Sequence, residues 1–240
     1  MAKSKKSVEG SIEIGSAERK IEFKQRKFKF SEKQKQLLDV CLNPETKAVF
    51  ITGPAGSSKT YMAVYAALNL LAINREWDMT YIRSIAESAD RGIGSLPGTV
   101  DEKFMPFLIP LEDKMEEIIT APTMVNLRKE QIINVLPVNF VRGANWTNKV
   151  VICDEAQNFS KKELITLITR IGEQSKLFIC GDLMQSDIRF SGFNDFINLF
   201  DDEESRAKGI HVFQFGKEDI YRSEILKFIV EKLEQLGKKV

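Results

Sequence analysis

The feature that most constrains this chain is the segment Gly53-Pro-Ala-Gly-Ser-Ser-Lys-Thr60, which stands between a predicted strand at 47–52 and a predicted helix at 59–71. In that context the segment predicts a phosphate-binding loop. Its amides and the helix dipole face the phosphates, Lys59 bridges the β and γ oxygens, and Thr60 ligates magnesium. An ordinary Gly/Ser-rich turn is the alternative. The expected nucleotide contacts are Gly53, Pro54, Ala55, Gly56, Ser57, Ser58, Lys59, Thr60 and Tyr61.

The loop departs from the usual pattern at Ser58, where glycine normally precedes the lysine. Gly53 and Gly56 are expected to allow the tight turn, because glycine adopts backbone conformations that other residues avoid. A residue that enters a helix does not need a positive φ, so we expect serine to be tolerated at position 58.

A second apolar run, residues 149–153, ends in Asp154 and Glu155. Ligands of open parallel sheets bind at the carboxyl edge, so both carboxylates are expected beside the loop. We assign Asp154 to magnesium and Glu155 to the orientation and deprotonation of the attacking water. One acid for the metal and another for water indicates hydrolysis, whereas a nucleotide kinase has little use for Glu155. The alternative role of Asp154 is a helix N-cap.

Strand and helix signals alternate along the chain, which predicts a parallel, doubly wound α/β sheet. Further strands are expected at 79–82, 149–153, 176–180 and 209–213, and further helices after a capping box at Ser31 and Gln34, at 161–171 and at about 218–236. We interpret 92–137 as loops and helices inserted into this core. Period-two alternation within 11–30 predicts a small basic β element. The expected parts are therefore a basic arm and β element at 1–30 and one α/β domain at 31–240.

Composition is that of an ordinary globular domain, with 43% hydrophobic and 29% charged residues among 240. The longest weakly polar stretch, 62–73, is far short of the ~20 residues of a membrane span. No signal-peptide pattern is visible, so we expect a cytoplasmic protein. Cys41, Cys153 and Cys180 are widely spaced and favour buried, reduced thiols over a disulfide or zinc site. His211 is the single histidine, and it has no nucleophile motif nearby.

Charge is unevenly distributed, although the net charge is only +1. The first 35 residues hold eleven Lys or Arg against five acids, so the remainder of the chain is mildly acidic. A basic arm on an acidic body favours contact with a polyanion such as RNA or single-stranded DNA. A solvated, lysine-rich terminus is the alternative.

Two further motifs carry a family resemblance: Asp154-Glu-Ala-Gln157 and Gly181-Asp-Leu-Met-Gln185 resemble motifs II and III of superfamily 1 helicases. The chain as a whole resembles the PhoH-like family of P-loop ATPases over about 31–236. Ordered matches carry this resemblance at Gln34, Gly53-Pro-Ala-Gly56, Arg83, Leu96-Pro-Gly98, Val141-Arg-Gly143, Asp154–Asn158, Thr169-Arg-Ile-Gly172 and Asp219-Ile-Tyr-Arg222. It implies a RecA-like core, magnesium-dependent ATP hydrolysis and an RNA-related role.

The resemblance also implies roles for single residues. Gln34 corresponds to a glutamine that reads the adenine edge, and Gln185 to one that senses the γ-phosphate. Arg222 matches an arginine that reaches the γ-phosphate, and Tyr221 an aromatic that stacks on adenine. Arg170 matches either a second phosphate contact or a finger offered to a neighbouring subunit, and its alternative is an ordinary surface residue.

Arg83 and Arg142 are candidates for contacts with nucleic acid or with another subunit, and ordinary salt bridges are the alternative. Superfamily 1 motors close two RecA-like domains around ATP, whereas we expect one such domain here. A motor built from this chain would need a second subunit, which predicts a ring, most simply a homohexamer of the kind that PhoH-like proteins are thought to form.

Three functions remain open from the sequence. The first is ATP hydrolysis coupled to binding or remodelling of RNA or single-stranded nucleic acid. The second is an ATP-switched interaction protein that does not translocate. The third is a small-molecule kinase. Stimulation of ATP turnover by nucleic acid favours the first, indifference to it the second, and phosphate transfer to a small acceptor the third.

Overall fold

The fold was analysed in a computed structural model that describes residues 21–24, 29–84, 100–141, 145–186, 188, 191–220, 225, 227–230 and 232. Its centre is a six-stranded sheet in the order β3-β2-β4-β5-β1-β6, in which every neighbouring pair is parallel. The strands are β1 (Ala48–Thr52), β2 (Asp78–Arg83), β3 (Ile133–Pro137), β4 (Lys149–Asp154), β5 (Ser175–Gly181) and β6 (Ile210–Gln214). The predicted doubly wound α/β fold of the RecA-like type is thereby confirmed.

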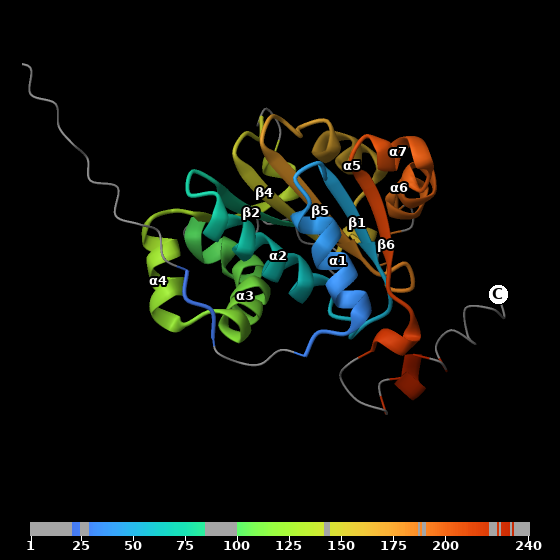
Figure 1. Ribbon diagram of the computed structural model, residues 1–240, viewed down its shortest axis with the longest axis horizontal. Coiled ribbons are helices and arrows are strands. Elements are labelled where there is room, and N and C mark those ends of the chain that lie inside the picture. The colour runs from blue at the N-terminus through green and yellow to red at the C-terminus, as the bar shows by residue number, and fades with distance from the viewer. Residues whose placement is uncertain are drawn as a thin grey trace, which may run out of the picture.

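Helices cover both faces of the sheet (Figure 1). The described helices are α1 (Glu32–Leu42), α2 (Lys59–Ile73), α3 (Val100–Ile118), α4 (Ala121–Lys129), α5 (Lys161–Ile168), α6 (Phe193–Phe200) and α7 (Glu203–Ala207). One buried cluster joins α1, α2 and α3 to alternate strand residues such as Ile51 and Ile152. The other joins α5 and α6 to the intervening strand residues, such as Phe50 and Cys153. Successive residues of a strand thus point into two separate cores, one on each face of the sheet, because side chains alternate along a strand.

The sixth strand, β3, is the one the sequence did not reveal, since we interpreted 92–137 as loops and helices only. It lies at the edge of the sheet, pairs with β2 alone and ends in Pro137. Proline is tolerated at such an edge because no second neighbour needs its missing amide. A helix within 92–137 was expected, and α3 continues through Pro106 and Pro110.

Helix α1 begins as predicted. The Ser31 hydroxyl accepts a hydrogen bond from the Gln34 amide at 3.1 Å, and Gln34 Oε1 accepts one from the Ser31 amide at 3.0 Å. Helix α5 begins with a second capping box, formed by Ser160 and Glu163. It ends at Ile168, three residues before the predicted end, because Ile171 leaves the helix to form a parallel bridge with Trp146.

Of the predicted β element at 11–30, only residues 21–24 and 29–30 are among the described residues, so the element as a whole stays a prediction. Phe23 forms one isolated antiparallel bridge with Ile119. Ile119 lies in the short connection between α3 and α4, which is too short to pair with a longer strand. The rings of Phe23 and Phe30 then pack on Tyr65 of α2, with centroid distances of 5.8 and 5.0 Å. Residues 21–24 and 29–30 therefore lie on the α2 and α3 side of the sheet.

The predicted last helix at 218–236 is described only in part. A short 3₁₀ turn covers Lys217–Asp219, and residues 225, 227–230 and 232 are helical. Among the helices that the structure describes, none combines the length and the apolar character needed to cross a membrane.

Candidate nucleotide-binding site

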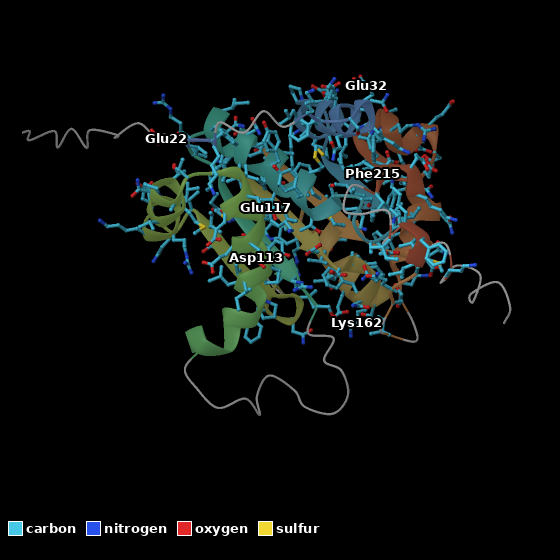
Figure 2. All side chains as sticks on the ribbon, turned by 90° about the horizontal axis from the view of Figure 1, so that it is seen from below. Glu22, Glu32, Asp113, Glu117, Lys162 and Phe215 are labelled. Carbon is cyan, nitrogen blue, oxygen red and sulfur yellow. The ribbon has the colours of Figure 1, made fainter. Side chains whose placement is uncertain are left out.

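The predicted phosphate loop joins the carboxyl end of β1 to the start of α2. Gly53 and Gly56 have φ values of 154° and 81°, in the region that favours glycine. A Cβ added to Gly53 would lie 2.7 Å from the Cβ and 3.0 Å from the carbonyl oxygen of Phe215, which is labelled in Figure 2. The tight turn therefore depends on glycine at both positions, as expected.

The expectation for Ser58 was wrong. Its φ of 68° and ψ of 18° place it in the left-handed region, directly before the first residue of α2. The chain must turn there from the loop into the helix axis, and glycine makes that turn without steric cost. Serine makes it at a cost of about 1 kcal/mol. Its hydroxyl does not recover this cost by capping α2.

Lys59 lies folded over the loop. Its ammonium group donates to the carbonyl oxygens of Gly53 at 2.6 Å and Pro54 at 2.9 Å. Burial lowers the pKa of Lys59, and the surrounding carboxylates, that of Asp182 foremost, oppose the shift. The lysine thus brings a partly desolvated charge to the position where a loop of this kind meets phosphate.

Asp154 ends β4 and lies next to the loop, as predicted. It is 5% exposed, and its Oδ1 accepts a hydrogen bond from the Thr60 hydroxyl at 2.6 Å. Its Oδ2 accepts a second hydrogen bond from Tyr81 of β2. Burial, and then the Asp154 carboxylate, raise the pKa of Tyr81 well above its usual value, so the phenol stays a donor. The two assigned metal ligands are therefore in direct contact.

This donor set fits magnesium. Mg²⁺ prefers oxygen ligands and is usually held by one or two carboxylates together with substrate phosphates and water. Thr60 and Asp154 supply a hydroxyl and a carboxylate at one point.

Glu155 follows in the left-handed region, with φ 54° and ψ 42°. One carboxylate oxygen, Oε1, lies 3.5 Å from Nη2 of Arg83. The other, Oε2, accepts a hydrogen bond from Gln157 at 2.6 Å. The carbonyl oxygen of Gln157's side chain accepts from the Asp182 amide at 2.9 Å. Gln157 therefore connects the segment that follows β4 with the segment that follows β5.

These groups line one cavity of about 410 Å³. Its walls come from the loop, from α3, and from the carboxyl ends of β2, β4 and β5. The lining residues are Ala55, Gly56, Ser58, Lys59, Thr60, Tyr61, Arg83, Pro110, Lys114, Glu117, Asp154, Glu155, Cys180, Gly181, Asp182 and Gln185.

A family model described as "PhoH-like protein" matches residues 29–234 of this chain. The chain belongs to the PhoH-like protein family. It is therefore a P-loop NTPase, and the family accounts for the loop and for the two acids that follow β4.

Curated relatives carry the same name. The chain is 34% identical to a PhoH-like protein of Synechocystis sp. over 78% of this chain and 56% of that protein. It is 32% identical to Protein PhoH of Escherichia coli K12 over 74% and 50%, and 31% identical to a PhoH-like protein of Bacillus subtilis over 76% and 57%. The chain thus spans about half the length of these relatives.

A solved structure of Pif1 helicase from Candida albicans is also similar, with 16% identity and a TM-score of 0.43 over 86% of this chain and 44% of that one.

Several of the predicted site residues do not line the cavity. Gln34 is 7% exposed and uses its side-chain carbonyl in the α1 capping box. Gly53, Pro54 and Ser57 shape the loop from behind it, and Ser57 donates to the Pro54 carbonyl at 2.8 Å. Tyr221, Arg222 and Arg142 lie outside the described residues, as does the segment 96–98.

Arg170 lies at the opposite edge of the sheet. Its carbonyl oxygen accepts a hydrogen bond from the amide of Trp146, a residue that precedes β4, whereas Asp154 ends that strand. A strand of this length spans about 20 Å, so Arg170 does not reach the cavity of its own chain. A finger offered to a neighbouring chain stays a prediction.

Sequence analysis missed several groups of the site. Asp182 was quoted within a motif but received no role, although it follows a buried strand just as Asp154 does. Tyr81 carried no signal, because a tyrosine within an apolar run is indistinguishable from core. Lys114 and Glu117 of α3 reach the site only because the fold places α3 beside the loop.

Proposed function

We propose that this chain binds ATP with magnesium and hydrolyses its terminal phosphate. The observation that carries the proposal is the direct contact of Thr60 with Asp154 at the mouth of the loop, with Glu155 as the next residue. These groups come from two places in the sequence and meet at one point of the sheet edge. A structural N-cap role for Asp154 would not explain its contact with the loop helix.

In this proposal each residue has a distinct part in the reaction. The loop amides and Lys59 bind the phosphates and stabilise the charge that develops on them. Thr60 and Asp154 would hold magnesium, which would supply further charge neutralisation when bound. Glu155 accepts a proton from water as the water oxygen bonds to the γ-phosphorus. The bond from that phosphorus to the bridging oxygen breaks, and its electron pair leaves with ADP.

We further propose that turnover is coupled to RNA or single-stranded DNA. Gln157 supports such coupling, because its side chain contacts both Glu155 and the Asp182 amide. A movement of the segment after β5 would therefore shift Glu155, the proposed base. The basic N-terminal arm supports a polyanionic partner. We also propose a homohexameric ring, in which Arg170, far from the cavity of its own chain, would meet the phosphates of a neighbouring chain. Three buried free thiols support the cytoplasm as the compartment.

The test measures ATP turnover while single-stranded RNA or DNA is titrated in. We expect stimulation, with Lys59→Ala lowering turnover at least a hundredfold while the far-UV circular dichroism spectrum stays unchanged. Turnover that ignores nucleic acid would favour an ATP-switched interaction protein without translocation. Near-normal turnover in Lys59→Ala would contradict the assignment of the loop.

A further inference from the structure

Three basic side chains among the described residues line the cavity, and each has an acceptor within this chain. Lys59 binds two carbonyl oxygens of its own loop. Lys114 lies 3.2 Å from Glu117, three residues along α3. Arg83 lies beside the two carboxylates at the end of β4. A phosphate that enters the cavity therefore competes with existing partners for every one of these cations.

Arg83 is held in place by the sheet itself. It is the last residue of β2 and lies opposite Asp154 in the β2–β4 register. Its Nε is 3.9 Å from Oδ2 of Asp154, and its side chain is only 25% exposed. Tyr81, two residues earlier and on the same face of the strand, binds that same Oδ2. The guanidinium group thus lies in the wall of the cavity, not in bulk solvent.

The contact with Glu155 is the consequential one. Arg83 holds one oxygen of the carboxylate and Gln157 holds the other. In the strand order, β2 lies on the far side of β4 from the loop-bearing β1. The guanidinium therefore attracts the carboxylate away from the side of the sheet on which Lys59 lies. As long as this ion pair is closed, the carboxylate is directed away from a water near the loop.

We propose that Arg83 exchanges partners when ATP binds: it leaves Glu155 for the terminal phosphate, and Glu155 is thereby free to act on water. Guanidinium binds phosphate oxygens in bidentate geometry, and a terminal phosphate carries more negative charge than one carboxylate. ADP lacks that group, so with ADP the ion pair with Glu155 stays closed. The inference rests on the proposed ATP hydrolysis and identifies the residue that distinguishes ATP from ADP.

The first test measures binding and not turnover. Calorimetric titration compares a non-hydrolysable ATP analogue with ADP, in magnesium buffer, on the wild type and on Arg83→Gln. We expect Arg83→Gln to bind the analogue at least tenfold more weakly than the wild type does. Its affinity for ADP should differ less than threefold from that of the wild type. Arg83→Lys, which keeps the charge but loses the bidentate geometry, should fall between them. Equal changes for both nucleotides, or none, would overturn the proposal.

A matched control is Arg206→Gln. Arg206 pairs with an aspartate, Asp201, at 3.0 Å and lies at the end of α7, outside the cavity. Arg206→Gln also removes a guanidinium group, but one outside the cavity. The affinities for the ATP analogue and for ADP should therefore both stay unchanged. Thermal unfolding of each variant shows whether the fold is retained.

The second test exploits the ion pair directly. Glu155→Gln removes the charge that retains Arg83, so the analogue should bind several-fold more tightly while ADP binding changes little. That gain should vanish in Arg83→Gln/Glu155→Gln. The same gain in both backgrounds would mean that Glu155 acts by general repulsion, and the proposal would fail.

The two proposals fail in different ways. A wild type that binds neither nucleotide would overturn the proposed function, and the role of Arg83 with it. A wild type that binds both, with Arg83→Gln weakening both alike, would overturn the role of Arg83 alone.

Discussion

At the scale of single residues, the site depends on backbone conformations that side chains usually avoid. Among the described residues five non-glycine positions have positive φ, and two of these, Ser58 and Glu155, lie in the cavity wall. Strain of this kind persists where the surrounding structure fixes it. At Glu155 it directs the carboxylate that follows β4, and at Ser58 it starts the helix that carries Lys59.

Ser58→Gly should raise the free energy of unfolding by about 0.5–1 kcal/mol, because glycine relieves the left-handed strain while adding some entropy to the unfolded chain. ATP turnover should be kept or raised. Urea denaturation measures the first effect and a phosphate-release assay the second. Ser58→Ala is the control: it removes the hydroxyl but keeps the strain, so it should not stabilise. A large loss of turnover in both variants would instead assign a role to the hydroxyl.

At the scale of elements, motifs predict structure best where a local rule decides the outcome. The capping box at Ser31 and Gln34 and the strands before the loop and before Asp154 obey such rules, and the structure has them. The rest depends on tertiary neighbours. Strand β3 exists because β2 offers it an edge, and the Tyr81 contact exists because β2 and β4 pair in one register. No pattern within 133–137 or around residue 81 records those neighbours.

Gln34 caps α1, and the family resemblance also assigns it a contact with adenine. Its substitution therefore tests a prediction at the scale of elements. Gln34→Ala should lower the free energy of unfolding by about 0.5–1 kcal/mol, through loss of the capping box. Gln34→Glu keeps an acceptor at this position and should keep stability. Urea denaturation measures both variants. A parallel titration with ATP and GTP shows whether Gln34→Glu alters base preference, which a purely capping side chain would not do.

At the scale of the whole molecule, the strand order brings the residues of the site together. The loop and the acids follow β1, β4 and β5, whose carboxyl ends lie at one edge of the sheet, and β2 brings Arg83 to the same edge. The fold class and most of this gathering could be predicted, because strand order in parallel sheets is constrained. The partners of Arg83 could not, since they depend on which strand stands beside β4.

The whole-molecule core also sets a pH dependence. Burial raises the pKa of all three thiols, to about 12 for Cys41, and lowers that of Lys176 to about 8. Around pH 8 the unfolded chain binds the extra proton at Lys176, so the free energy of unfolding should rise. Above about 9 the thiols ionise only in the unfolded chain, so it should fall. Urea denaturation across pH 7–10.5 should show a maximum between about pH 8 and 9.

Cys153→Ala serves as the matched variant, because it removes one of the three titrating thiols. Its free energy of unfolding should fall less steeply above pH 9 than that of the wild type, whatever its absolute stability. If the free energy of unfolding falls equally steeply above pH 9 in both proteins, thiol burial does not cause the loss of stability at alkaline pH.

The last prediction separates the basic arm from the domain that carries the phosphate loop. Replacement of Lys3, Lys5 and Lys6 by Gln should weaken binding to single-stranded RNA and leave basal ATP turnover unchanged. Each lysine that contacts a phosphate releases about one counterion, so three contacts change the slope of log affinity against log salt by roughly two to three units. Fluorescence anisotropy at several salt concentrations measures that slope. Because glutamine keeps the length and polarity of the arm, a smaller slope would report lost phosphate contacts, whereas an unchanged slope would place the three lysines in solvent and leave RNA binding to the domain that carries the loop.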